Sequence, residues 1–306
     1  MEFVHKSVLY DEVIESLNIR PNCIYVDGTA GGAGHSKGIA EKLDKGFLYA
    51  LDRDPDAIAT ATKRLEGLPA KVIKTNFMYM DEVLNDEGVS GVDGILLDLG
   101  VSSFQLDTAE RGFYYHKESP LDMRMSKDGT SASDIVNNYS AGELAEIFTK
   151  YGEEKFSYKI AQSIVRKRET TPITTTTQLA EIIASSVPAF ARRDGHPARK
   201  CFQALRIAVN GELESLEAAI GKAFDLLNKD GVLSIITFHS LEDRMVKLKF
   251  KEFCTGCTCP SDFPICVCGK TPRGKLVNRK PITATQRELD ENPRSRSATL
   301  RSIRKL

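Results

Sequence analysis

The sequence predicts an α/β fold in which a doubly wound, largely parallel sheet is interrupted by an inserted helical domain. Three observations lead to this fold class. Short apolar runs alternate with helical patterns over residues 1–100, periodicity is purely helical from 132 to 186, and a long apolar run returns at 231–238. Strands that alternate with helices form parallel sheets whose two faces are covered by those helices.

The elements of the first part of the chain follow in a regular order. Apolar runs predict strands and the periodicity predicts helices, with strands at 23–27, 47–52, 71–74 and 94–98 and helices at 35–43 and 55–65. Asp27, Asp52 and Asp98 each close one of these strands. Because the carboxyl ends of parallel strands share one edge of the sheet, we expect a ligand site there.

The middle of the chain predicts helices alone. Apolar residues recur at helical spacing on one face over 144–151 and on another over 160–165, and the threonine run at 174–177 is typical of a helix cap. No convincing strand pattern interrupts them. We therefore expect an all-helical insert at 107–205.

The last part of the chain returns to the sheet. A helix predicted at 205–227 leads into the strand at 231–238, and a basic tail follows from Arg244. We expect residues 1–106 and 206–306 to form one discontinuous sheet domain, with the basic tail packed on that domain or lying beside it.

The charge of the chain is balanced in total but segregated along its length. The 42 Lys and Arg residues cancel the 42 Asp and Glu residues. Residues 244–306 nevertheless carry a local charge of +10 and residues 150–206 a local charge of +6, which leaves −16 for the remainder. This segregation predicts a surface that faces a polyanion and is built from two separate stretches.

The composition excludes several other classes of protein. No run approaches the ~18 consecutive apolar residues of a transmembrane helix, and the N-terminus lacks the layout of a signal peptide. Seven cysteines are too few for a disulfide scaffold in a chain of 306 residues. We therefore expect a cytoplasmic protein that does not bind a membrane.

A glycine-rich loop follows the first strand. Residues 27–35 leave the strand at Asp27 and open a helix, so backbone N–H groups can approach a polar ligand closely. Asp52 lies 25 residues further on, where a carboxylate can accept hydrogen bonds from ribose hydroxyls. The loop departs from the G-x-G-x-x-G fingerprint, which favours S-adenosylmethionine over a nicotinamide dinucleotide. The alternative is an ordinary tight turn without a ligand.

The loop after the fourth strand is the candidate site of reaction. Asp98 ends a buried run and is followed by small and polar residues up to Gln105. A carboxylate that accepts a hydrogen bond from an exocyclic amine would concentrate electron density on that nitrogen and align it for attack on a methyl group. The alternatives are that Asp98 only binds the cofactor, or that it caps the next turn.

Five blocks of the sequence carry a resemblance to a known family. The blocks are residues 27–36, 98–103, 120–125, 202–210 and 238–244. Together they resemble the MraW-like family of bacterial 16S rRNA (cytosine-N4) methyltransferases, and the match spans nearly the whole chain. The resemblance implies a class I S-adenosylmethionine-dependent methyltransferase fold with a helical insert. It also implies methylation of a decoding-centre cytidine in 16S rRNA of the small ribosomal subunit, with no DNA substrate.

The resemblance also assigns individual residues. By family likeness the cofactor contacts fall on Ala33, Gly34, His35, Asp52, Phe77, Asp98 and Gln105. Asp98 would in addition be the catalytic residue. Phe77 follows the third strand, where its ring could stack on adenine or fill the core. Amine methyltransferases generally carry Asp or Asn, two prolines and an aromatic residue after this fourth strand. Residues 98–101 depart from that pattern, since they contain neither prolines nor an aromatic, and Phe104 could instead stack on the target base.

Five of the seven cysteines crowd into one short segment. They are Cys254, Cys257, Cys259, Cys266 and Cys268. Four thiolates from short loops can bind Zn²⁺ tetrahedrally. The sequence leaves structural zinc and reduced cysteines without metal as equal alternatives.

Basic stretches and one histidine complete the candidates. Arg166–Arg168, Arg192–Arg193, Arg199–Lys200 and residues 294–305 together favour a rim that holds RNA phosphates, although each alone could be a solvated face. His239 follows the strand at 231–238 and could contact RNA, organise the acceptor pocket or play a structural role.

Two other functions fit parts of this pattern. An NAD(P)-dependent oxidoreductase would share the α/β scaffold and the ribose-binding acid. A zinc-containing RNA-binding factor for ribosome assembly would share the basic stretches and the cysteines without catalysing a reaction. We prefer the methyltransferase, because it accounts for the loop, Asp52 and Asp98 together.

Overall fold

The computed structural model of the chain divides into two compact units. It describes residues 7–192, 196–259, 265 and 268–306. The sheet unit comprises Met1–Gly100 and Glu214–Leu306, and the helical unit comprises Val101–Leu213. The insert expected at 107–205 lies within the helical unit, which extends several residues further at both ends.

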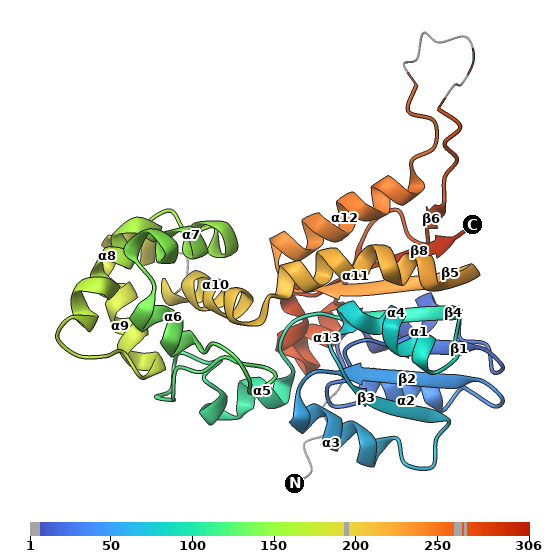
Figure 1. The fold of residues 1–306 in the computed structure, drawn as a ribbon, viewed down its shortest axis with the longest axis horizontal. Helices are drawn as coiled ribbons and strands as arrows, with labels where there is room; N and C mark the ends of the chain where they lie inside the picture. The colour runs from blue at the N-terminus through green and yellow to red at the C-terminus, as the bar shows by residue number, and fades with distance from the viewer. Residues whose placement is uncertain (1–6, 193–195, 260–264, 266–267) are drawn as a thin grey trace. The chain divides into compact units, whose positions relative to one another are not determined.

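An eight-stranded sheet runs through the sheet unit (Figure 1). Its order is β3-β2-β1-β4-β5-β8-β6, and β7 pairs with β8. The first five strands are parallel, whereas β8 is antiparallel to its neighbours. The strands are β1 (Ile24–Asp27), β2 (Phe47–Asp52), β3 (Ala70–Lys74), β4 (Val92–Asp98), β5 (Leu227–Thr237), β6 (Gly274–Leu276), β7 (Ile282–Thr283) and β8 (Thr299–Lys305). The strand order reverses between β1 and β4, so the predicted doubly wound sheet is confirmed.

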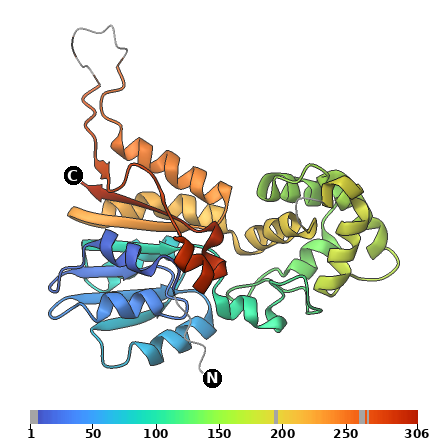
Figure 2. The ribbon, with the colours of Figure 1, turned by 180° about the vertical axis from the view of Figure 1, so that it is seen from behind.

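Helices cover both faces of this sheet, as Figures 1 and 2 show from opposite sides. Helices α4, α11 and α12 pack on the face that carries Leu97, and α1, α2 and α3 pack on the face that carries Leu96. Neighbouring strand residues point to opposite faces, so a continuous apolar run serves both layers. The helices are α1 (Tyr10–Leu17), α2 (Gly34–Ala40), α3 (Pro55–Arg64), α4 (Met80–Asp86), α11 (Glu212–Leu226), α12 (Ser240–Cys254) and α13 (Gln286–Glu291), with short 3-10 turns η1 (Phe77–Tyr79) and η4 (Pro293–Ser297).

The helical unit has a core of its own. Residues such as Leu144, Phe148 and Ile160 are completely buried in it. Its helices are α5 (Ser103–Asp107), α6 (Ala132–Asn138), α7 (Ala141–Gly152), α8 (Ser157–Arg168), α9 (Thr176–Ser186) and α10 (Ala198–Asn210), with 3-10 turns η2 (Ala109–Arg111) and η3 (Ala189–Arg192). Among the residues described in this unit, β pairing is limited to one bridge between Pro120 and Thr175.

Two expectations from the sequence are wrong in detail. The single helix expected at 205–227 is two helices, because Gly211 adopts a left-handed φ of 56° and caps the end of α10. In addition, the basic tail does not simply lie on the sheet. Its last residues form β8, which sits inside the sheet between β5 and β6.

Candidate active site

Three parallel strands of the sheet unit deliver acids to one edge of the sheet. Asp27, Asp52 and Asp98 are the last residues of β1, β2 and β4. The parallel pairing of β1 with both neighbours places all three carboxyl ends at this edge. The sheet register therefore brings the three acids to one edge of the sheet, and their common role in binding a ligand stays a prediction.

The glycine-rich loop is held by two of these acids. Asp52 Oδ2 accepts the Gly31 N–H at 2.8 Å, and Asp27 Oδ1 accepts the Thr29 N–H at 3.1 Å. A Cβ on Gly28 would lie 2.5 Å from Leu97 Cδ2, so only glycine allows the loop to lie this close to β4. The loop is thus fixed by the strands on either side of it.

Asp27 acts as a scaffold residue. Its side chain is buried, and Oδ2 accepts the Ser36 hydroxyl at 2.6 Å. Burial raises the pKa of Asp27 to about 6, although the hydrogen bonds from Ser36 and Thr29 oppose the shift. Both oxygens are used within the protein, so Asp27 joins the loop to the first turn of α2.

Asp52 combines a scaffold role with capacity for a ligand. Besides binding Gly31, it accepts the Asp54 N–H through Oδ1 at 2.8 Å. Burial raises its pKa above the ordinary range, and these backbone N–H groups oppose the shift. Each carboxylate oxygen has a second lone pair, so Asp52 can also accept hydroxyl hydrogen bonds.

Asp98 differs from the other two acids because one of its oxygens is not satisfied. Oδ1 is buried and has no hydrogen-bond partner among the described residues. Its own backbone N–H donates to Thr29 Oγ1 at 2.6 Å. Burial, followed by the nearby charges of Asp27 and Glu242, raises the pKa of Asp98 to about 8. A buried acceptor without a partner beside a ligand-binding loop is typical of a functional site.

His35 lies beside Asp98 without forming a strong ion pair. Its Nε2 is 3.6 Å from Asp98 Oδ2, and its ring stacks on Tyr10 with 5.9 Å between ring centroids. Burial lowers the pKa of His35 to about 4, so the imidazole is neutral at pH 7. The site therefore holds a neutral imidazole next to a carboxyl group that stays protonated to about pH 8.

The remaining predicted cofactor residues fall in different places. Ala33 has a left-handed φ of 59° and precedes Gly34 at the start of α2. Phe77 begins η1 and is half-buried. It lies close to the glycine-rich loop, since a Cβ added to Gly28 would be 3.1 Å from the Cβ of Phe77. Gln105 belongs to the helical unit, where it closes a capping box with Ser102. Its contact with a cofactor stays a prediction.

Sequence reasoning missed Glu242 as a member of this site. Its carboxylate is buried and accepts the backbone N–H of Phe238 at 2.9 Å and of His239 at 3.3 Å. Its charge also contributes to the raised pKa of Asp98. The signal was present, since the 238–244 block contains Glu242, but an acid at the third position of a helix is ordinarily part of a cap.

His239 is the N-cap residue of α12. Its Nδ1 accepts the Glu242 N–H at 3.4 Å, and Nε2 lies 3.1 Å from Glu242 Oε1. The side chain is 8% exposed. The Nδ1 contact favours the structural alternative for that atom, whereas the buried Nε2 makes no hydrogen bond with a described residue.

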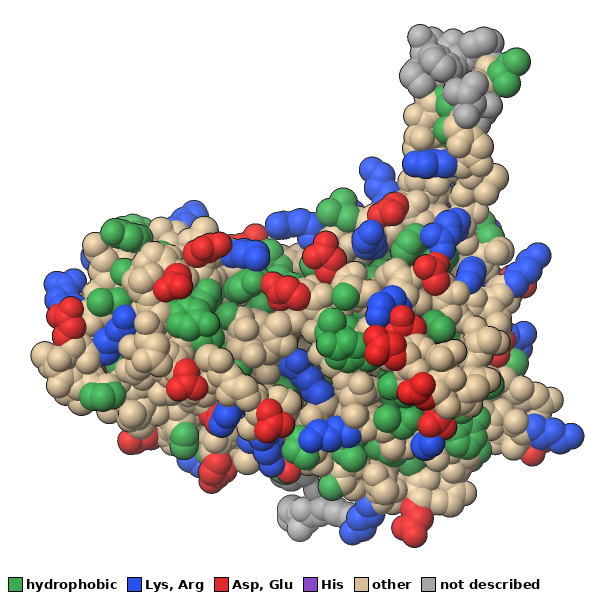
Figure 3. Space-filling view, viewed as in Figure 1, with side chains coloured by type: hydrophobic (Ala, Val, Ile, Leu, Met, Phe, Trp, Pro, Cys, Tyr) green, Lys and Arg blue, Asp and Glu red, His purple; other side chains and the backbone are tan. Residues whose placement is uncertain are grey.

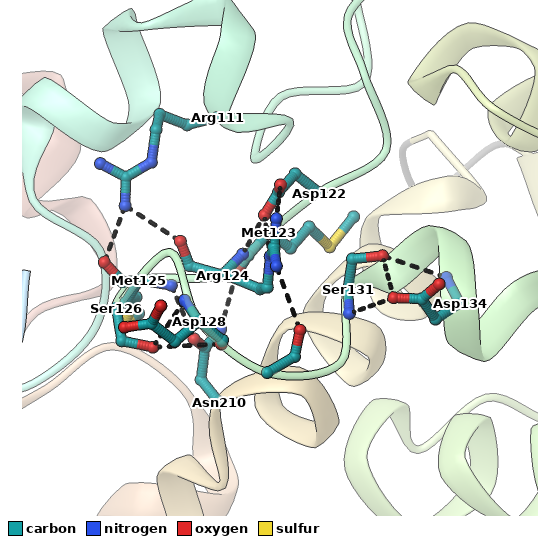
Figure 4. A network of polar contacts seen from close by, with 11 residues as sticks. Arg111, Asp122, Met123, Arg124, Met125, Ser126, Asp128, Ser131, Asp134 and Asn210 are labelled. Atoms are coloured by element: carbon teal, nitrogen blue, oxygen red, sulfur yellow. Dashed lines mark hydrogen bonds and ion pairs between the residues drawn. The ribbon is translucent and has the colours of Figure 1, made fainter.

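Two other blocks meet inside the helical unit (Figure 4). Asn210 accepts the Met125 N–H at 2.9 Å and donates to the Met123 carbonyl at 2.8 Å, while Arg111 donates to the Arg124 and Met125 carbonyls at 3.0 and 2.9 Å. We call these five residues the Asn210 network. It fixes the loop at 123–125, where buried Met123 has a φ of 63°.

The basic stretches differ in how far their charges are available. Arg166, Lys167 and Arg199 are exposed, whereas Arg168 donates to the Val136 carbonyl and Lys200 to the Glu153 carbonyl. The side chains of Arg192 and Arg193 lie outside the described residues. Figure 3 shows Lys and Arg interspersed with Asp and Glu over the visible face, without a uniformly basic area.

The basic tail is partly used inside the sheet unit. Arg301 forms a two-pronged ion pair with Asp243 at 2.7 and 3.0 Å. Lys305 donates to the carbonyls of Asp225 and Leu227, and burial lowers its pKa. The local charge of +10 therefore overstates the positive charge with which this segment can bind a polyanion.

The doubly wound sheet, with a glycine-rich loop after β1 and acids at the ends of β2 and β4, has the architecture of a class I S-adenosylmethionine-dependent methyltransferase. Comparison with known proteins specifies the family. A family model described as the MraW methylase family matches residues 2–306. The chain belongs to this family, and its methyl donor is S-adenosylmethionine.

Curated relatives match over the full length. Ribosomal RNA small subunit methyltransferase H of Clostridium botulinum (strain Loch Maree / Type A3) is 54% identical over 309 residues, covering 100% of both chains. The protein of the same name from Lachnospira eligens is 52% identical over 311 residues, covering 100% of this chain and 99% of the relative. Within the described residues, no helix of the structure is long and apolar enough to span a bilayer.

Proposed function

We propose that this methyltransferase transfers a methyl group from S-adenosylmethionine to the exocyclic N4 amine of a cytidine in the decoding centre of 16S rRNA. The observation that carries the proposal is the buried Asp98 oxygen without a partner at the end of β4. The names of the full-length relatives support small-subunit rRNA as the substrate. The resemblance of the five sequence blocks supports the N4 atom and the decoding centre.

Asp98 suits an amine acceptor for a physical reason. The lone pair of an aromatic amine is delocalised into the ring, so the nitrogen is a weak nucleophile. An acceptor for one N–H bond turns the lone pair out of conjugation and towards the methyl carbon. The Asp98 oxygen is buried and has no partner in the described chain, so it can serve as this acceptor.

The charge balance of the reaction also fits the site. The bond from sulfur to the methyl carbon breaks as the bond from nitrogen to that carbon forms, so the sulfonium becomes a neutral thioether and the amine gains a positive charge. One proton then leaves the nitrogen. The pKa of Asp98, about 8 in the chain alone, falls beside a cation, so its carboxylate can receive this proton and pass it to water.

The other residues of the sheet unit bind the cofactor in this proposal. Asp52 accepts hydrogen bonds from the ribose hydroxyls, and the loop at Ala33 and Gly34 approaches the cofactor through its backbone. His35 presents a neutral ring, and Phe77 stacks on adenine. Gln105 of the helical unit contributes a further contact, as the family resemblance implies.

The helical unit holds RNA in this proposal. Arg166 and Lys167 at the end of α8 and Arg199 on α10 are exposed cations that can bind phosphates. Binding of these cations to RNA phosphates releases counterions from the RNA. Because that release is less favourable at high salt concentration, the affinity falls as the salt concentration rises. A flipped or single-stranded cytidine can then reach the active site.

The decisive experiment identifies the methylated atom. Small subunits from cells that lack this activity are incubated with the protein and S-adenosylmethionine bearing a tritiated methyl group. The decoding-centre fragment of the rRNA is isolated, and its nucleosides are separated by chromatography and identified by mass spectrometry. We expect label in N4-methylcytidine from the decoding centre. Label at cytosine C5, on another base or only outside the decoding centre would refute the proposal.

The oxidoreductase alternative has its own test. Titration calorimetry compares S-adenosylmethionine with NAD(P)H on the same protein. Membership in a methylase family leads us to expect binding of S-adenosylmethionine alone. Selective binding of NAD(P)H would favour the alternative, and binding of S-adenosylmethionine without transfer to subunits would favour a non-catalytic assembly factor.

A further inference from the structure

The segment between α12 and β6 is unusual for a compact unit. In the described part of residues 255–273 there is no helix or strand. Connections longer than about 12–15 residues without secondary structure are uncommon unless something else stabilises them. Figure 1 shows two arms that run beside each other beyond α12 and β6.

The base of the two arms is closed by ordinary contacts. The Arg273 N–H donates to the Phe253 carbonyl at 2.8 Å. Gly256 approaches Pro272 so closely that a Cβ on Gly256 would lie 3.1 Å from Pro272 Cδ. Further out, the Thr258 N–H and the Cys257 sulfur contact the Cys268 sulfur across the two arms.

Three cysteines from the two arms bring their sulfurs together. The Sγ atoms of Cys257, Cys259 and Cys268 all lie within 4.8 Å of one another, and those of Cys257 and Cys268 are 3.8 Å apart. With Zn–S bonds of about 2.3 Å, two ligands of a tetrahedral site are separated by about 3.8 Å. This spacing is far from the S–S bond of about 2.05 Å in a disulfide.

Backbone N–H groups point at the same sulfurs. The Cys259 N–H donates to Cys257 Sγ at 3.4 Å, and the Thr258 N–H donates to Cys268 Sγ at 3.4 Å. Such bonds stabilise negative charge on sulfur and orient thiolate ligands in metal sites. The bond from Thr258 to Cys268 crosses between the arms, so the arrangement depends on both arms of the segment.

The neighbouring cysteines provide a contrast. Cys254 packs against the core of the sheet unit, and burial raises its pKa. It is absent from the group of three sulfurs. Cys266 lies outside the described residues.

We propose that Cys257, Cys259 and Cys268 bind a thiophilic divalent cation, Zn²⁺ in the cell, which fastens the two arms together. The proposal concerns a structural site, and it is independent of the methyl-transfer reaction. Zinc bound by thiolates supplies folding free energy to segments that lack a core of their own.

Cobalt substitution tests the site directly. The reduced, metal-free full-length protein is titrated with Co²⁺ and followed by its d–d absorption and its thiolate-to-cobalt charge-transfer bands. We expect about one equivalent of tetrahedral, thiolate-bound Co²⁺ per chain, displaced by Zn²⁺. Failure of the reduced protein to give these bands would overturn the proposal.

Matched serine variants locate the ligands. Cys257→Ser and Cys268→Ser should each weaken metal binding by at least about 100-fold, whereas Cys254→Ser and Cys23→Ser should retain it. Thermal unfolding of each variant without metal establishes that the chain is folded. Equal loss in the Cys254→Ser control, or unchanged binding in Cys257→Ser, would refute the assignment.

Limited proteolysis supplies a second readout. Zinc should slow cleavage within 255–273 at least tenfold in the natural chain and have no effect in Cys257→Ser. Protection by zinc that persists in Cys257→Ser would also contradict the proposal.

Discussion

The Asp98 site and the Asn210 network are both buried and polar, yet their groups are satisfied differently. In the Asn210 network, Asn210 and Arg111 bond to backbone groups at 123–125. At the Asp98 site, one carboxyl oxygen has no partner in the described chain and the adjacent His35 is neutral. The first region is complete within the protein, and the second needs a ligand to complete it.

This difference separates residues that serve stability from residues that serve function. Burying a carboxyl group without a partner costs free energy, and its pKa rises as a result. Completing the hydrogen bonds of a buried amide instead contributes stability. Changes at Asp98 should therefore affect activity more than folding, and changes at Asn210 should do the reverse.

The largest expected effect is that of Asp98→Ala on methyl transfer. Loss of the acceptor for the amine should lower kcat by at least about 10²–10³-fold, comparable to removing one group that stabilises charge in a transition state. The temperature of unfolding should stay unchanged or rise, because a buried unpaired carboxyl group is removed. The value of kcat is measured by transfer of tritiated methyl groups, and the temperature of unfolding by a thermal melt. Near-normal turnover would remove Asp98 from the mechanism.

Asn210→Ala should have the opposite profile. It leaves the Met125 N–H and the Met123 carbonyl without their buried partner, so the free energy of unfolding should fall by about 2–4 kcal/mol. Denaturant unfolding followed by a probe in the helical unit measures it. The control is Arg124→Ala, which keeps the Arg124 backbone carbonyl of the network and removes only side-chain bonds, namely the partly exposed pair with Asp122 at 2.7 Å and the bond to the Gly129 carbonyl at 3.1 Å. It should cost no more than about 1 kcal/mol. Equal losses in the two variants would contradict the special role of the Asn210 network.

The raised pKa of Asp98 predicts a dependence of stability on pH. Between its unfolded value near 3.8 and about 8, Asp98 is protonated in the folded chain and ionised in the unfolded chain, so stability falls as pH rises. His35, with its folded pKa of about 4 against 6.5, acts in the opposite direction below pH 6.5.

The clearest window for this effect lies between about pH 6.5 and 8, where His35 no longer titrates. There the free energy of unfolding should fall by up to about 1.4 kcal/mol per pH unit in the cofactor-free protein. Denaturant unfolding at a series of pH values checks this slope. Asp98→Asn should flatten it, and a slope that persists in that variant would assign the titration to another group.

Asp52→Asn should produce a smaller, selective effect. The amide keeps one acceptor for the Gly31 N–H but loses charge and acceptor capacity for ribose, so affinity for S-adenosylmethionine should fall about tenfold. The value of kcat at saturating cofactor should change little, because the interaction is made equally before and during reaction. Calorimetry and steady-state kinetics separate the two. A drop in kcat as large as that of Asp98→Ala would contradict this assignment and would give Asp52 a catalytic role as well.

The sequence could predict the parts of this fold that depend on local patterns. The strand at Phe47–Asp52 and the acids at the ends of β1, β2 and β4 follow from apolar runs that stop at Asp. β8 could not be found in this way, because the two apolar residues of Thr299–Lys305, Leu300 and Ile303, are three residues apart and do not alternate with polar ones; the strand obtains its place through pairing with β5. The same holds for Glu242, whose relation to Asp98 depends on two strands distant in sequence.

The smallest expected effect is that of His239→Asn, and it tests where the Asp98 site ends. Asparagine is among the best N-cap residues, so it can accept the Glu242 N–H in place of Nδ1. The free energy of unfolding should change by no more than about 1 kcal/mol, with His239→Ala costing about 1 kcal/mol more. If the Nδ1 cap of α12 is the whole role of His239, kcat/KM for RNA should stay within about threefold in the asparagine variant. A stable His239→Asn protein with a much larger loss would place the imidazole in the acceptor pocket and extend the functional region beyond Asp98.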